Sequence, residues 1–130
     1  MEQRITAVTL ATRDLAALVA FYERLGWTCA QHVPGEVAFF AAGGMVLSLW
    51  AELPGPTAGV QLAHNVRTPA EVDAAIAEAV RAGATVRHPA AEQSWGGRSG
   101  VWADPEGHEW EVAFNPHWPL AADGTVTLGG

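Results

Sequence analysis

The chain has 130 residues, of which 49% are hydrophobic, and it carries 7 Lys and Arg against 14 Asp and Glu, for a formal net charge of −7. This length predicts one domain, 1–130, and is too short for two full-sized independent cores. The negative charge repels phosphate backbones and anionic lipid surfaces, so we expect neither nucleic acid nor a membrane as a partner. The single cysteine, Cys29, excludes an intrachain disulfide, and segment 1–15 lacks the apolar run of a signal peptide or a membrane span. We therefore expect a cytoplasmic protein.

The first part of the chain, about residues 4–50, has the pattern of one strand, one helix and three further strands. Asp14 can cap a helix whose apolar residues recur at helical spacing, and Gly26 ends this helix. The turn pairs Pro34-Gly35 and Gly43-Gly44 separate the later strands. Strands are predicted at 5–12, 27–32, 36–41 and 45–50.

The second part, about residues 60–115, repeats the same order after a linker at 51–59, which contains two prolines and two glycines. Thr68-Pro69-Ala70-Glu71 has the spacing of a capping box with proline at the first helical position, and Gly83 ends the helix. Strands are predicted at 60–67, 85–90, 97–103 and 108–115, with a turn at 104–107 and a tail at 116–130. The chain therefore consists of two predicted βαβββ modules.

Three stretches carry a more specific signal: VTLATRDL at 8–15, FYERLGW at 21–27 and DPEGHEWE at 104–111. Placed as they are in a repeated module, they resemble the glyoxalase/bleomycin-resistance/dioxygenase (vicinal oxygen chelate) superfamily over about residues 4–116. The resemblance implies an α+β fold in which two tandem βαβββ modules form a cupped mixed sheet with helices on the convex side. It also implies a small-molecule cavity. It does not fix the function, because the superfamily includes isomerases, dioxygenases, epoxide-opening lyases and drug-sequestering proteins.

The resemblance also indicates where a metal would bind. In metal-bearing members the ligands lie on the first and last strands of each module, and the aligned motifs place Ala7, Ser48, Gln61 and Glu111 there. Glu111 is the strong ligand among these four, whereas a catalytic divalent ion normally takes about three protein ligands. We therefore expect a degenerate metal site, without a metal or another cofactor.

Strand alternation predicts which other side chains share the inner face of the cup with Glu111. Glu109 falls on the same face, whereas His108 falls on the opposite face, which excludes a metal pair of His108 and Glu111. The side chains that we expect to bind a ligand are Ser48, Trp50, Gln61, Asn65, Trp95, Arg98, Glu109 and Glu111.

Glycines surround two of these residues, Trp95 and Arg98, in the loop 95–100. This composition is typical of a mobile lid or of an ordinary hairpin loop with one packed tryptophan. In the lid, Trp95 lines a pocket and Arg98 can clamp a carboxylate. Three other tryptophans are assigned to packing, namely Trp27, Trp102 and Trp110.

Three functions remain open. The first is a protein that binds a small aromatic or cationic molecule without a metal, as in drug sequestration and antibiotic resistance. The second is a metal-dependent lyase, isomerase or dioxygenase that uses Gln61, Glu111 and further ligands. The third is a metal-free enzyme with Glu111 as general base, its pKa raised by burial. The degenerate ligand set favours the first and third functions over the second.

The partners expected are a small-molecule ligand and a second copy of the chain. Trp50 and the carboxylates Glu109 and Glu111 predict a preference for a flat aromatic or cationic ligand over an anionic one. A homodimer is expected because open sheet edges are otherwise a liability.

Overall fold

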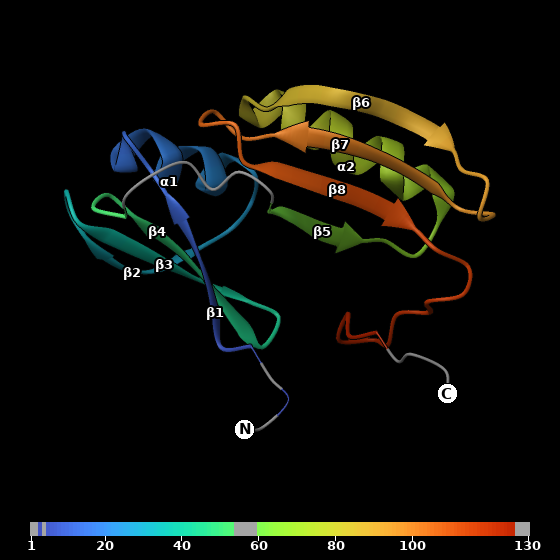
Figure 1. Ribbon diagram of the computed structural model, residues 1–130, viewed down its shortest axis with the longest axis horizontal. Helices are drawn as coiled ribbons and strands as arrows, with labels where there is room; N and C mark the ends of the chain where they lie inside the picture. Colours follow the sequence, from blue (N-terminus) through green and yellow to red (C-terminus); the bar gives the residue numbers. More distant parts are fainter. Residues whose placement is uncertain (1–2, 4, 54–59, 127–130) are drawn as a thin grey trace. The chain divides into compact units, whose positions relative to one another are not determined.

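The computed structural model describes residues 3, 5–53 and 60–126, and within them the chain forms two helices and eight strands (Figure 1). By its internal contacts the chain divides into two compact units, Met1–Gly59 and Val60–Gly130, called unit 1 and unit 2 below. Each unit holds one strand, one helix and three further strands, which confirms the predicted α+β class and the tandem βαβββ modules. The pairing of the modules into one cupped domain stays a prediction. Across the described ranges, no helix is long and apolar enough to cross a membrane.

Unit 1 contains a four-stranded sheet and one helix. Its elements are β1 Ala7–Ala11, α1 Leu15–Arg24, β2 Cys29–Val33, β3 Val37–Ala42 and β4 Met45–Trp50. The strand order is β1-β4-β3-β2, with β1 parallel to β4 and the other pairs antiparallel. The Asp14 carboxylate accepts a hydrogen bond from Ala17 N at 3.0 Å, so the predicted cap of α1 is confirmed. Gly26, with φ of 99°, follows the last turn of the helix.

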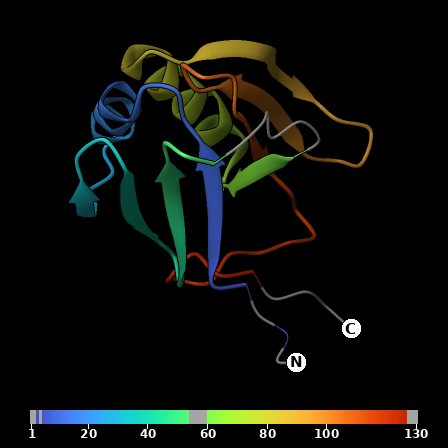
Figure 2. The ribbon, with the colours of Figure 1, turned by 60° about the vertical axis from the view of Figure 1, so that its left-hand side comes forward.

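The core of unit 1 lies between α1 and one face of this sheet (Figure 2). The fully buried Tyr22 ring of α1 packs on Phe40 of β3 at a centroid distance of 5.9 Å. Trp27 packs on both rings, as predicted, at 5.8 Å from Tyr22 and 6.3 Å from Phe40. Because Phe40 pairs with Leu47 and strand residues alternate between faces, Ser48 points to the opposite face. We call the sheet face opposite a unit's helix its open face.

Unit 2 repeats this arrangement. Its elements are β5 Gln61–Asn65, α2 Pro69–Ala82, β6 Thr85–Glu92, β7 Arg98–Ala103 and β8 Glu109–Phe114, in the sheet order β5-β8-β7-β6. The predicted capping box is present: Thr68 Oγ1 accepts from Glu71 N at 3.3 Å, and Glu71 Oε2 accepts from Thr68 N at 3.1 Å. Gly83 ends α2 in the left-handed conformation, with φ of 117°.

The core of unit 2 lies between α2 and one face of its sheet. Trp102 and Trp110 are buried and stack with ring centroids 5.5 Å apart and planes 7° apart, which confirms their assignment to packing. Gly100, two residues from Trp102 along β7, faces α2, because a Cβ there would lie 2.5 Å from Ile76 Cδ1. By alternation, Glu111 of β8 therefore lies on the open face.

The described part of the tail, 116–126, forms a small hairpin, for which no structure was assigned from the sequence. Leu120 pairs with Val126, and Ala121 N donates to Thr125 O at 2.8 Å. Arg67, which follows β5, donates from Nη2 to Ala121 O at 2.7 Å and ties the hairpin to unit 2. Residues 54–59 of the predicted linker and 127–130 of the tail lie outside the described residues.

Candidate functional site

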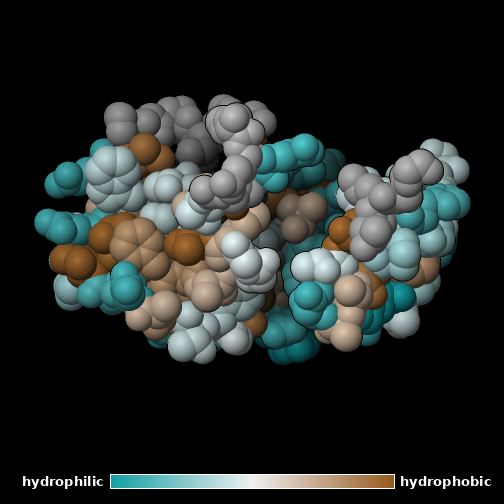
Figure 3. All heavy atoms as spheres, turned by 90° about the horizontal axis from the view of Figure 1, so that it is seen from below, coloured by the Kyte–Doolittle hydropathy of each residue, from teal (hydrophilic) through white to brown (hydrophobic). Residues whose placement is uncertain are grey.

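The open face of unit 1 is largely apolar. Ala7 and Thr9 of β1 register with Val46 and Ser48 of β4, so these four side chains share the open face with Trp50. Ser48 is buried, whereas Trp50 is 39% exposed at the end of β4. Hydrophobic side chains also gather on the surface over unit 1, on the left of Figure 3. This face therefore offers an aromatic and apolar surface around the largely buried Ser48.

The open face of unit 2 carries polar and charged side chains. The register pairs Gln61 with Glu109, Ala63 with Glu111 and Asn65 with Ala113, so that the predicted Gln61, Asn65, Glu109 and Glu111 share one face. Gln61 Nε2 donates to Glu109 Oε1 at 3.2 Å. The structure thus brings together two predicted ligand-binding residues that are far apart in sequence.

Arg87 also belongs to this face, although sequence reasoning did not name it. Its Nε lies 4.0 Å from Glu109 Oε2, and both side chains are partly exposed. The register of β6 shifts between Val86 and His88, next to Arg87. Thr85 pairs with Ala103 on the open face. Arg87 lies two residues after Thr85 in the predicted strand, and this spacing was the signal that would have identified it. The cation partly balances the charge of Glu109.

Glu111 differs from Glu109 in its surroundings. It lies within β8, between Ala63 of β5 and Val101 of β7, and is half-buried. Its neighbours in the register carry no polar side-chain group, and no hydrogen bond or ion pair of its carboxylate is found in the described part of the chain. The Glu111 carboxylate is therefore available to a ligand.

The four positions aligned with family metal ligands do not fit a divalent ion. Ala7 has no donor atom, Ser48 offers a neutral hydroxyl, and Gln61 offers a neutral amide oxygen, with its Nε2 bonded to Glu109. Glu111 is the one carboxylate, against about three ligands in a typical catalytic site. Within the described residues, no group of three or more His, Cys, Asp and Glu side chains could hold a metal ion. This donor set supports no metal-dependent step.

The Trp95 ring lies directly on the backbone of its own loop. A Cβ built on Gly97 would fall 1.8 Å from Trp95 Cζ3 and 2.5 Å from Cη2, so the ring occupies the place of a side chain at this position. The indole therefore rests on the loop backbone at Gly97, where it is 42% exposed.

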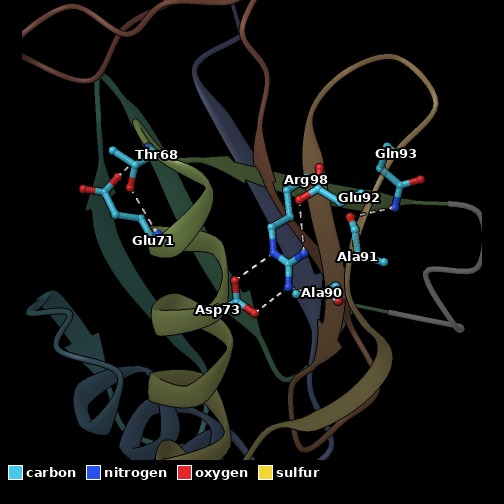
Figure 4. A network of polar contacts seen from close by, with 8 residues as sticks. All are labelled: Thr68, Glu71, Asp73, Ala90, Ala91, Glu92, Gln93 and Arg98. Carbon is cyan, nitrogen blue, oxygen red and sulfur yellow. Dashed lines mark hydrogen bonds and ion pairs between the residues drawn. The ribbon is translucent and has the colours of Figure 1, made fainter.

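Arg98 points the other way, toward α2 (Figure 4). Its Nε and Nη2 donate to the two carboxylate oxygens of Asp73, each at 2.8 Å, and Nη1 lies 3.5 Å from Glu92 Oε1. The hydrogen bond from Arg98 lowers the pKa of Asp73 below its ordinary value of 3.8. The expected role of Arg98 as a ligand clamp is therefore corrected: its guanidinium is held by carboxylates on the helix side, and it leaves the set of proposed ligand contacts.

The fold agrees with comparisons to known proteins. The model of the Glyoxalase/Bleomycin resistance protein/Dioxygenase superfamily matches residues 4–112, and the chain belongs to this superfamily. A glyoxalase-related enzyme from Fulvimarina pelagi is 37% identical with a TM-score of 0.89, covering 99% of this chain and 100% of that one. A glyoxalase/bleomycin resistance protein/dioxygenase from Nocardioides is 28% identical with a TM-score of 0.73, covering 99% and 91%.

Two further similarities are narrower. TioX from Micromonospora sp. ML1 shares the fold at 23% identity and a TM-score of 0.71, covering 86% of this chain and 98% of that one. An uncharacterized protein of Mycobacterium bovis is 49% identical over 45 residues, which are 35% of this chain and 30% of that protein. The chain thus spans less than a third of the length of the curated relatives that it matches.

Proposed function

We propose that this protein binds a small aromatic or cationic molecule on the open faces of its sheets, without a metal, as a ligand-binding or drug-sequestering member of the superfamily. The observation that carries the proposal is the half-buried Glu111 carboxylate, which has no partner in the described part of the chain. A carboxylate in a partly desolvated position is costly unless a countercharge or a donor reaches it. A cationic ligand supplies that charge.

The other side chains support a ligand with a ring and a positive charge. The exposed parts of Trp50 and Trp95 offer π-faces that attract a cation by about 0.5–2 kcal/mol each. The net charge of −7 adds a long-range attraction. The positive charge of Arg87 opposes this attraction, but Arg87 lies beside Glu109 and balances that carboxylate first.

An enzymatic function is the second candidate. The similar structure from Fulvimarina pelagi, 37% identical, is described as a glyoxalase-related enzyme. In a metal-free lyase or isomerase, Glu111 would take a proton from a bound substrate, because a carboxylate without a competing partner is free to act as a general base. The donor set gives no comparable support to a metal-dependent dioxygenase.

Binding of three probes tests the proposal: proflavine as a flat aromatic cation, 2-naphthoate as a flat aromatic anion, and choline as a non-aromatic cation. We expect proflavine to bind most tightly in isothermal titration calorimetry. Trp50→Ala should weaken its binding by about 1–3 kcal/mol, the range for a buried aromatic anchor. Glu111→Gln, which keeps the shape and removes the charge, should weaken it about tenfold, or about 1.4 kcal/mol.

Glu109→Gln is the matched control, because Glu109 already has Gln61 and Arg87 beside it, and its loss should cost less than that of Glu111. The site is not a cation site if 2-naphthoate binds more tightly than proflavine and if Glu111→Gln tightens the binding of 2-naphthoate further. If a reaction is found, loss of turnover in Glu111→Gln with affinity retained would favour the enzymatic candidate.

A further inference from the structure

The Trp95 loop is closed by contacts of its own. Gln93 N donates to Gly97 O at 2.9 Å, and Gly96 N donates to Gln93 O at 3.0 Å. The indole edge rests on Gly97, where the missing Cβ leaves room for it. The position is specific to glycine, since a Cβ would also fall 2.2 Å from the backbone oxygen of Phe114, which cannot move as a side chain can.

The two strands that carry this loop are fastened at its base. Arg98, the first residue of β7, bonds Asp73 of α2 through two hydrogen bonds of 2.8 Å and lies 3.5 Å from Glu92, the last residue of β6 (Figure 4). Its Nη2 also donates to Ala90 O of β6 at 3.4 Å. One guanidinium therefore connects α2 with both ends of the loop, and a bidentate arginine–carboxylate pair fixes orientation as well as distance.

We propose that Asp73 and Arg98 form a positioning pair that holds the Trp95 indole in place on the loop backbone at Gly97, as a preformed aromatic wall for a flat ring. The kind of ligand in this inference rests on the proposed function. The position of the ring rests on the contacts of the loop. A ring that is already placed loses little conformational entropy when a ligand stacks on it, so binding needs no loop closure. Arg98 acts through Trp95 and does not touch the ligand.

The position of Trp95 can be tested without any ligand. Protein labelled with 5-fluorotryptophan gives one fluorine NMR signal for each tryptophan, and Trp95→Phe assigns the signal of Trp95. We expect Asp73→Asn and Arg98→Gln to shift or broaden the Trp95 signal, while the signals of the buried Trp102 and Trp110 stay in place. Glu78→Gln, at an exposed acid of the same helix with no ion pair to a described residue, should leave Trp95 unchanged.

Gly97→Ala provides an independent variant, because its Cβ takes the place of the ring while Asp73 and Arg98 both keep their side chains. It should shift the Trp95 signal as well. Urea unfolding of each variant verifies that the fold is retained. An unchanged Trp95 signal in both Asp73→Asn and Arg98→Gln would overturn the positioning role.

Ligand binding supplies the second readout, with proflavine as the probe. Asp73→Asn should weaken proflavine binding by roughly three- to tenfold, as expected when an aromatic anchor loses its fixed position. In a Trp95→Ala background the same change should have no further effect, since the wall that it positions is gone. If Asp73→Asn weakened proflavine binding by the same factor in the Trp95→Ala background as in the wild-type protein, the result would contradict the inference. If no variant and no wild-type protein binds proflavine, the proposed function fails, while the fluorine signals still decide the positioning role.

Discussion

Tryptophan shows most clearly how the position of a residue in this fold decides its role. Trp102 of β7 and Trp110 of β8 are paired in the sheet register on the face that α2 covers, and their rings stack in the core. Trp50 lies on the open face of unit 1 and Trp95 lies in the loop between β6 and β7, and each keeps about two fifths of its surface exposed. The same ring thus fills a core or offers a binding surface, depending on the strand face or the loop in which it stands.

The donor atoms of single residues also predict the metal content. After dialysis, we expect the purified protein to hold far less than one equivalent of Zn, Ni, Fe or Mn, because Glu111 is the one strong ligand among the four aligned positions. Elemental analysis by plasma mass spectrometry measures this directly. About one equivalent of metal in the dialysed wild-type protein would contradict the prediction.

At the scale of the element, the two helices begin by different means. α1 starts at Asp14, whose carboxylate accepts a hydrogen bond from one backbone N–H, and α2 starts at Thr68 in a reciprocal box with Glu71. Glu71 Oε2 also accepts from Arg67 N at 2.7 Å, so one carboxylate satisfies two backbone donors before the helix. The start of α2 is therefore fixed by three hydrogen bonds, close to the strand β5 that carries Gln61 and Asn65.

This network predicts the effect of removing the cap. Thr68→Ala should lower the free energy of unfolding by about 1 kcal/mol, because it removes the hydroxyl that accepts from Glu71 N. Thr68→Ser keeps the hydroxyl and should cost less. Urea unfolding followed by circular dichroism measures the difference. Equal losses in the two variants would show that the hydroxyl does not cap α2.

The sheet edges matter at the scale of the whole molecule. Each sheet has two edge strands, β1 and β2 in unit 1 and β5 and β6 in unit 2. β6 is an irregular edge, with two register shifts, Pro89 and the charges of Arg87 and Glu92, all features that oppose pairing with another chain. β2, with the sequence CAQHV, has one register shift, between Cys29 and Gln31, and it has no Asp, Glu, Lys, Arg or Pro to oppose such pairing.

An edge with fewer such features than β6 supports the expected homodimer. Sedimentation at micromolar concentration should give twice the chain mass of 13.7 kDa. Gln31→Pro, which removes a backbone donor in the middle of β2, tests whether this edge takes part. A monomer mass for the wild-type protein would rule the homodimer out at that concentration.

The sequence by itself determined the elements, because their signals are local. The capping residues Asp14 and Thr68 and the stop at Gly83 act within one turn of the helix that they begin or end. The predicted strand 45–50 matches β4, and the other strands differ by a few residues at their ends, where pairing with a neighbour sets the limit. Alternation also placed Gln61, Glu109 and Glu111 on one face, since side-chain direction follows from strand position alone.

The tertiary structure decided which of these side chains are already engaged. The bond between Gln61 and Glu109 joins residues 48 positions apart, and the bond between Asp73 and Arg98 joins residues 25 positions apart. Such pairs depend on strand register and on how a helix packs on a sheet, and neither is encoded in a local pattern. Arg98 was predicted as a ligand clamp because its loop carries glycines and a tryptophan, whereas packing places a carboxylate of α2 within 2.8 Å of it. The partner of a charged side chain is a property of the folded chain, because it is set by whatever the fold brings within reach.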